Sequence, residues 1–111
     1  MERLVTLPAQ QLQRKFKHAG DFGVHGNYNA ANAAAFGDAI RAHMLDQDTL
    51  VMNGTLLRGP KQGGSPAIFY LNVASRLMVV TDRRGTFVTG FRLTPQQLEA
   101  LQQTGNLGGG A

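Results

Sequence analysis

Hydrophobic residues in the first part of this chain recur at helical intervals. Leu12 and Phe16 lie one helical turn apart and form a stripe that a helix would bury. Thr6 and Pro8 are typical of the entry to such a helix, and Gly20 is expected to end it. We therefore predict a first helix between Thr6 and Gly20.

A second helical segment follows a short polar stretch. Asn27 or Asn29 can serve as its N-cap, and the helix should end before Asp48. Its buried face would consist of residues spaced three or four positions apart: Ala33, Phe36, Ile40 and Met44. The pattern up to residue 48 thus predicts two helices.

From Leu50 onward the pattern changes to short runs typical of β-strands. We predict strands at residues 50–57, 67–73, 77–81 and 86–93. The connections at 72–75 and 82–85 are short enough for hairpins, so the last three strands should form an antiparallel meander. Residues 68–71 and 77–80 are apolar without alternation, which indicates central strands covered on both faces.

Two glycine-rich segments complete the pattern. The loop at residues 59–66 has three glycines, two prolines and Lys61, and is a candidate loop for contacting a substrate. Thr94 and Pro95 begin a final helix that should end at Gly105. Residues 106–111 are expected to form a flexible Gly-rich tail.

These elements predict one domain of the α+β class over residues 1–105. Two N-terminal helices would pack on an antiparallel four-stranded β-sheet, followed by a short C-terminal helix. A chain of 111 residues with 42% hydrophobic content can bury one such core. Without cysteine it contains neither disulfides nor thiolate ligands. No segment approaches the ~18 apolar residues of a membrane span, and no signal peptide is recognisable at the start.

Charge narrows the possible partners. Eleven Lys and Arg against seven Asp and Glu give a net charge of +4 and a pI near 10.1. The protein should therefore attract nucleic acid, an anionic membrane or an acidic protein, and charge alone does not choose among them. The three histidines have no metal-ligand spacing, and no nucleotide-binding motif is present, so we expect no metal and no cofactor.

The densest candidate chemistry surrounds His18. On a helix, Arg14 and Lys15 share a face with His18, whereas Lys17 would join them only through fraying or 3₁₀ geometry. Nearby cations lower a histidine pKa and a helix C-terminus raises it, which leaves the direction open. RNA cleavage without metal needs a base for the 2′-hydroxyl, an acid for the 5′-oxygen and cations for the phosphate. One histidine and two lysines could supply that set.

The segment around this histidine resembles a known family. Residues 15–23, Lys-Phe-Lys-His-Ala-Gly-Asp-Phe-Gly, are closely similar to the stretch around the catalytic histidine in the tRNA-cleaving domain of colicin D. Related polymorphic and contact-dependent inhibition toxins share this stretch. The resemblance continues through other segments and spans about residues 12–105: residues 36–40, 48–49, 54–55, 77–85 and 87–93.

The resemblance implies a role for several residues. His18 would be the general acid/base, and Lys15 and Lys17 would bind the scissile phosphate and stabilise its transition state. Where the family has Ser-Gly-Trp, this chain has residues 89–91, so that Thr89 would offer a hydroxyl to the phosphate. Phe91 projects from the same face and would stack on a base.

Phe91 has a second interpretation, and Arg92 an added role. Phe91 could be a core aromatic, because Phe87, Thr89, Phe91 and Leu93 alternate onto one face of the predicted strand. Arg92 stands where a family lysine is common and would contact backbone phosphate.

The resemblance also implies a substrate and a biological setting. The fold would be that of colicin D and of barnase- and RelE-like ribonucleases, and the reaction would cleave tRNA in its anticodon loop to leave a 2′,3′-cyclic phosphate. A basic surface would bind the tRNA: Arg14, Lys15, Lys17, Lys61 and Arg92.

The domain would be the C-terminal part of a secreted or cell-surface bacterial toxin that acts in the cytoplasm of the target cell. It would be monomeric when free, would not bind membranes itself and would be inhibited by an acidic cognate immunity protein.

Alternatives remain at this stage. His25 could be a second acid/base, whereas His43 is expected to make a structural hydrogen bond and Asp21 to fix the turn after the first helix. Arg83 and Arg84 would be solvated turn residues or RNA contacts. The domain could instead be a non-catalytic RNA-binding or protein-interaction module, a DNA-binding regulator, or a nuclease that acts on rRNA or mRNA.

Overall fold

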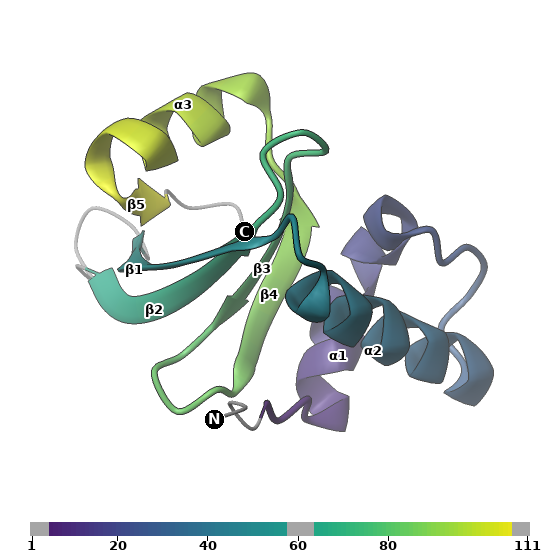
Figure 1. Cartoon of the computed structure of the whole chain (residues 1–111). Helices are drawn as coiled ribbons and strands as arrows, with labels where there is room; N and C mark the ends of the chain where they lie inside the picture. Colours follow the sequence, from purple (N-terminus) through teal and green to yellow (C-terminus); the bar gives the residue numbers. More distant parts are fainter. Residues whose placement is uncertain (1–4, 58–63, 108–111) are drawn as a thin grey trace.

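The change in spacing near residue 50 separates the helical part of the molecule from its sheet. The computed structural model describes residues 5–57 and 64–107 (Figure 1). Its elements in chain order are α1 (Ala9–Lys15), the 3₁₀ helix η1 (Phe16–Phe22), α2 (Ala30–Leu45), β1 (Leu50–Leu57), β2 (Gly64–Leu71), β3 (Leu77–Thr81), β4 (Phe87–Arg92), α3 (Pro95–Thr104) and β5 (Asn106–Leu107). The predicted α+β architecture is confirmed.

The sheet has the order β4-β3-β2-β1-β5, in which β1 to β4 are antiparallel as predicted. The fifth strand corrects the prediction of a flexible tail from residue 106. Asn106 and Leu107 pair in parallel with Thr55 and Leu56 of β1. A strand of two residues has no periodicity to detect, and its pairing depends on where α3 ends. Residues 108–111 lie outside the described part of the chain.

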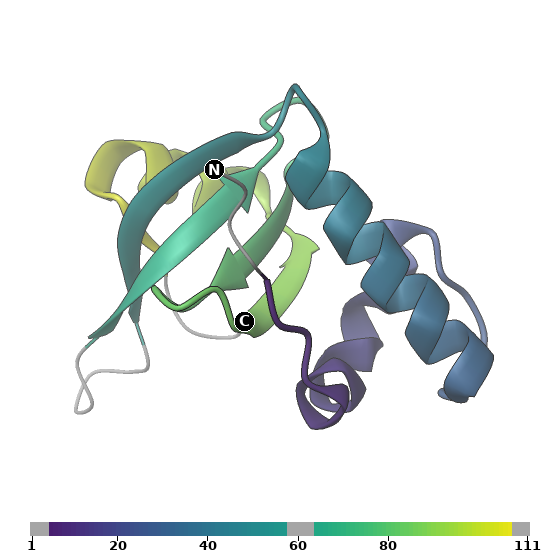
Figure 2. The same cartoon turned by 60° about the horizontal axis from the view of Figure 1, so that its bottom comes forward.

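Helices cover both faces of the sheet, with α1 and α2 on one face and α3 on the other (Figures 1 and 2). Neighbouring residues of the central strands therefore enter two different cores. Ile68 packs with α1, η1 and α2, whereas Phe69 packs on the α3 side with Leu101. Val79 and Val80 are divided in the same way, which explains apolar runs without alternation.

The helix ends follow mostly from local side chains. Asn29 caps α2, its side chain accepting the Asn32 N–H at 2.8 Å. Thr94 and Gln97 form a reciprocal capping box at the start of α3, and Gly105 ends that helix with a φ of +73°. No helix within 5–57 and 64–107 is long and apolar enough to cross a membrane.

The first helix departs from its prediction. It changes to 3₁₀ geometry at Phe16 and continues through Gly20, the expected stop, to end at Gly23 with a φ of +82°. The Gly23 and Val24 N–H groups close this end on the carbonyls of Gly20 and Ala19. Gly20 is helical because the chain finds its left-handed C-cap three residues later.

A β-bulge divides β4 between the two cores. Thr89 pairs with Val80, but Phe87 pairs with Thr81, so that Val88 is the extra residue. Phe87 consequently packs on the α1 and α2 side, whereas Phe91 packs on the α3 side. This corrects the prediction that Phe87 and Phe91 share one face.

Candidate active site at the edge strand

The 3₁₀ geometry sorts the residues of η1 into three rows, because side chains three positions apart eclipse each other. One row is apolar: Phe16, Ala19 and Phe22 pack with the α1 and α2 core. A second row runs Lys15, His18 and Asp21, all partly buried. The third row, which begins with Lys17, is exposed. Lys15 and His18 are therefore aligned by the helix itself, while Lys17 lies on the neighbouring row.

η1 clasps β4, the edge strand of the sheet, from both faces. On one face, Phe22 lies over Gly90, where an added Cβ would come within 3.0 Å of its ring. On the other face, the His18 ring lies on Phe91, with centroids 5.4 Å apart and planes tilted by 36°. Gly90 therefore permits the close approach that brings the imidazole onto Phe91.

Two buried polar atoms mark this site. Within the described part of the chain, His18 Nε2 and Thr89 Oγ1 are the buried side-chain nitrogen and oxygen without a hydrogen-bond partner. Thr89 is fully buried and lies two residues from Phe91 on β4. A buried polar atom without a protein partner costs about 1–3 kcal/mol, so each one needs an explanation such as a catalytic role or a bound water.

The surroundings of His18 lower its pKa. Burial is the largest cause, because it disfavours the charged imidazolium. Lys17 and Lys15 lower the pKa further, and Asp21 raises it. The sequence left this direction open; here burial and the cations prevail, so the ring is mainly neutral at pH 7 and can accept a proton.

Lys15 experiences a similar environment. Its pKa is lowered, first by burial and then by the charge of Lys17. A lysine in this position keeps its cation close to His18 while holding its proton less tightly than a solvated lysine does. The pair thus combines a proton acceptor, His18, with a cation, Lys15.

Asp21 anchors this arrangement to the sheet. Its carboxylate accepts the Arg92 backbone N–H at 3.0 Å, and its carbonyl oxygen accepts the Arg92 guanidinium at 3.3 Å. We predicted that Asp21 fixes the turn after the first helix, but its carboxylate instead bonds to β4, 71 positions away. Sequence reasoning had no signal for this pairing.

Two further contacts from the N-terminal segment secure β4. The Gln11 side chain donates to the carbonyl of the bulge residue Val88. Thr6 bridges β4 near its start, exchanging backbone hydrogen bonds of 2.9 Å with Gly85 and Phe87. Together with Asp21, these contacts occupy the open edge of the strand that carries Thr89 and Phe91.

The structure brings most of the predicted site together, with one change of role. His18, Lys15, Lys17 and Thr89 gather around β4, and Arg14 is exposed in the last turn of α1. Phe91 is only 5% exposed and supports the imidazole, so the open ring that we predicted for base stacking is not offered there. The bulge and the η1 contact bury it.

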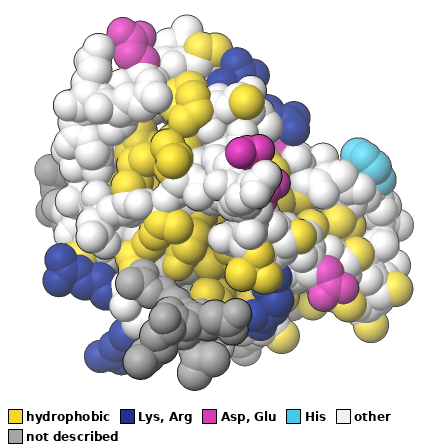
Figure 3. All heavy atoms as spheres, viewed as in Figure 1, with side chains coloured by type: hydrophobic (Ala, Val, Ile, Leu, Met, Phe, Trp, Pro, Cys, Tyr) yellow, Lys and Arg dark blue, Asp and Glu magenta, His cyan; other side chains and the backbone are white. Residues whose placement is uncertain are grey.

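The other basic residues predicted to bind RNA are Arg92 and Lys61. Arg92 is exposed at the end of β4, with its guanidinium partly engaged by Asp21. Lys61 lies outside the described residues. On the face shown in Figure 3, Lys and Arg lie around the rim, and hydrophobic side chains gather between α3 and the sheet.

The other two histidines are not part of the row formed by Lys15, His18 and Asp21. His43 is buried in α2, and its Nε2–H donates to the Tyr70 carbonyl at 2.8 Å, which confirms the structural hydrogen bond expected for it. His25 is exposed in the loop after η1. Across 5–57 and 64–107, no three His, Cys, Asp or Glu side chains form a group that could hold a metal ion.

Comparison with known proteins places this geometry in a family. A family model described as Colicin D matches residues 11–101. Colicin-D of Escherichia coli is 37% identical over 87 residues, which make up 78% of this chain and 12% of that protein. The chain therefore spans only a small part of the length of this relative.

A solved structure extends the likeness to three dimensions. It is described as a ribonuclease from Escherichia coli complexed with its inhibitor protein, and matches with a TM-score of 0.72 and 32% identity. The match covers 87% of this chain and 100% of the solved one. Since the family match spans the site from Gln11 to Arg92, this chain belongs to the colicin D family and is a colicin D-type toxin domain.

Proposed function

We propose that this domain is an endoribonuclease that cleaves tRNA in the anticodon loop by metal-independent acid–base chemistry. The observation that carries the proposal is the pair of buried, unpartnered atoms, His18 Nε2 and Thr89 Oγ1, beside the cations of Lys15 and Lys17. At an RNA phosphodiester, the neighbouring ribose 2′-hydroxyl would donate to Nε2, and the phosphate oxygens would accept from the Thr89 hydroxyl and lie near the two lysine cations. The similar solved structure is described as a ribonuclease, which supports the same reaction class.

The residues supply each part of the reaction. Neutral His18 accepts the proton of the ribose 2′-hydroxyl as the 2′-oxygen forms a bond to phosphorus. The bond from phosphorus to the 5′-oxygen breaks, and the imidazolium returns its proton to that oxygen. The products are a 2′,3′-cyclic phosphate and a 5′-hydroxyl.

The other groups of the site act on the phosphate. Lys15 and Lys17 stabilise the charge that develops on the pentavalent phosphate. The Thr89 hydroxyl, which is fully buried in the free domain, would donate to a non-bridging oxygen once the bound RNA opens the contact between η1 and β4. Preorganised donors of this kind are each worth about 3–4 kcal/mol of transition-state stabilisation where their removal has been measured.

The proposal extends to setting and partner. The domain would form the C-terminal part of a secreted bacterial toxin and act in the cytoplasm of the target cell, stopping translation. The similar ribonuclease is described as complexed with an inhibitor protein. For this chain, with a net charge of +4, we propose an acidic immunity protein that covers His18 and the cations of η1.

The test is incubation of the purified domain with total bacterial RNA in EDTA, followed by sequencing of the new 5′ ends. His18→Ala should abolish discrete anticodon-loop cuts, and Thr89→Val should weaken them. Gln102→Ala, on the exposed face of α3, serves as the control and should cleave like the parent. Cuts confined to rRNA or mRNA would reassign the substrate.

Two outcomes would contradict the proposal. Absence of cleavage, even with cell extract, would leave a binding module. Equal cleavage by His18→Ala would remove the assigned catalytic residue.

A further inference from the structure

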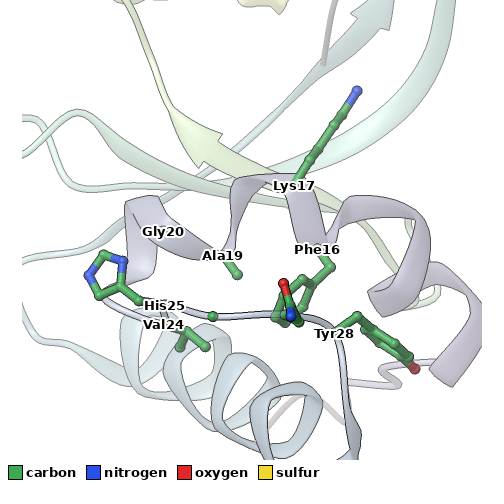
Figure 4. Close-up of a pocket in the computed structure, with 9 residues that line it drawn as sticks. Phe16, Lys17, Ala19, Gly20, Val24, His25 and Tyr28 are labelled. Carbon is green, nitrogen blue, oxygen red and sulfur yellow. The ribbon is translucent and has the colours of Figure 1, made fainter.

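A pocket of about 400 Å³ lies next to the proposed active site. Its lining includes Phe16, Ala19, Val24, His25 and Tyr28 (Figure 4). His18 does not line it, because its ring turns to Phe91. The residues on either side of His18 in the sequence do, however, so the pocket and the imidazole share η1 as a common wall.

Local contacts hold the residues of the pocket in place. Gly26 has a φ of +104°, and an added Cβ there would lie 3.0 Å from the Asn32 side chain. That side chain donates to the Asn27 carbonyl at 2.8 Å and so ties the loop to the first turn of α2. The ring of Tyr28 is held edge-on by Phe16, with centroids 5.4 Å apart and an interplanar angle of 85°.

The chemistry of the lining suits a flat, polar-edged ring. Tyr28 is 43% exposed and presents an aromatic surface, while Ala19 and Val24 supply apolar contact. His25 and Asn27 bring side chains that can both donate and accept hydrogen bonds. In Figure 4, His25 and Tyr28 lie at opposite ends of the pocket, and the Lys17 side chain extends away from it.

We propose that this pocket binds an unpaired nucleobase of the RNA substrate, next to the nucleotide that is cut. The inference rests on the proposed nuclease function and adds a specificity site to it. Phe91 is buried beneath His18, so Tyr28 is the aromatic residue beside η1 that remains open for stacking. The Lys17 ammonium is directed away from the pocket and would contact the scissile phosphate, which would lie between the cut nucleotide and the base in the pocket.

The experiment uses the fact that the chain has no tryptophan. Tyr28→Trp in a His18→Ala background introduces a single fluorophore, to be titrated with single-stranded 2′-O-methyl oligoribonucleotides that cannot be cleaved. The oligonucleotides carry the mapped cut site or, if no cut is found, a homopolymer of each base. The affinities of Tyr28→Ala and Tyr28→Phe are measured by their competition with the Tyr28→Trp protein for the same oligonucleotide. Gln102→Ala, on the exposed face of α3, is the control.

We expect base stacking to quench the fluorescence of the introduced indole. Tyr28→Ala should weaken binding by roughly tenfold, in the range of one lost base stack, and Tyr28→Phe should retain it. An abasic nucleotide at one position should cause the same loss in the parent and no further loss in Tyr28→Ala. With cleavable RNA, Tyr28→Ala should raise KM more than it lowers kcat.

Other results would overturn the proposal or separate it from the nuclease function. Unchanged affinity for every oligonucleotide in Tyr28→Ala removes the pocket, and weaker capture of a purified inhibitor protein by this variant would then assign the surface to that partner. If RNA is cleaved normally and its binding does not depend on Tyr28, the base-binding proposal is refuted and the nuclease function stands. If binding depends on Tyr28 but no RNA is cleaved, the base-binding proposal stands and the nuclease function is refuted.

Discussion

Two substitutions of Asp21 should distinguish its effect on the position of His18 from its effect on the pKa of His18. Asp21→Ala removes the acceptor of the Arg92 N–H, which lies at 3.0 Å. Hydrogen bonds to charged groups contribute about 1.5–3 kcal/mol, and partial exposure reduces this one to about 1 kcal/mol. The melting temperature should fall by about 4–8 °C. If η1 shifts on β4 by ~1 Å, cleavage should fall by about 100-fold, far more than the stability loss explains.

Asp21→Asn is the matched variant, because its amide oxygen can still accept the Arg92 N–H while the charge is lost. Asp21 raises the pKa of His18, so its neutralisation should lower that pKa further. A base must be deprotonated to act, and the acidic limb of kcat/KM against pH should therefore move to lower pH with little loss of the plateau rate. Equal loss of the plateau in both variants would refute the anchoring role, and a limb moved to higher pH would refute the electrostatic one.

Three further predictions use single substitutions. Thr89→Val replaces an unpartnered buried hydroxyl with a methyl group; denaturant titration should show about 1 kcal/mol of added stability, while cleavage of RNA falls. Lys17→Gln removes a charge that lowers the pKa of His18, so the acidic limb of the pH profile should move to higher pH as the rate drops. Gly54→Ala would place its Cβ 2.4 Å from the Phe69 ring, so thermal unfolding should show a loss of about 3 kcal/mol, and wild-type stability would show that this packing is mobile.

Periodicity predicted the main elements because each depends on its own residues. The candidate caps Asn27 and Asn29, the pair Thr94 and Pro95, and the uninterrupted apolar runs are local signals, and each predicted its element within a few residues. β5 and the bulge at Val88 depend on pairing between distant segments, which leaves no periodic trace.

The site divides in the same way. The cluster from Lys15 to His18 is contiguous, so the sequence reveals it directly. The packing of His18 on Phe91 requires the bulge, the Asp21 anchor and Gly90 to act together across more than 70 positions. The lowered pKa of His18 arises chiefly from that burial, which is why charge spacing alone could not give its direction.

The clasp of η1 on β4 also sets the order in which the domain can become active during synthesis. Gln11 and Asp21 reach partners 77 and 71 positions later in the chain. When His18 has left the ribosome but β4 has not, the strand that holds η1 in place is still missing. Lys15, Lys17 and His18 emerge from the ribosome first and reach the arrangement of the proposed active site only when Arg92 has followed. On that proposal, a partly made chain would be inactive in the cell that makes it.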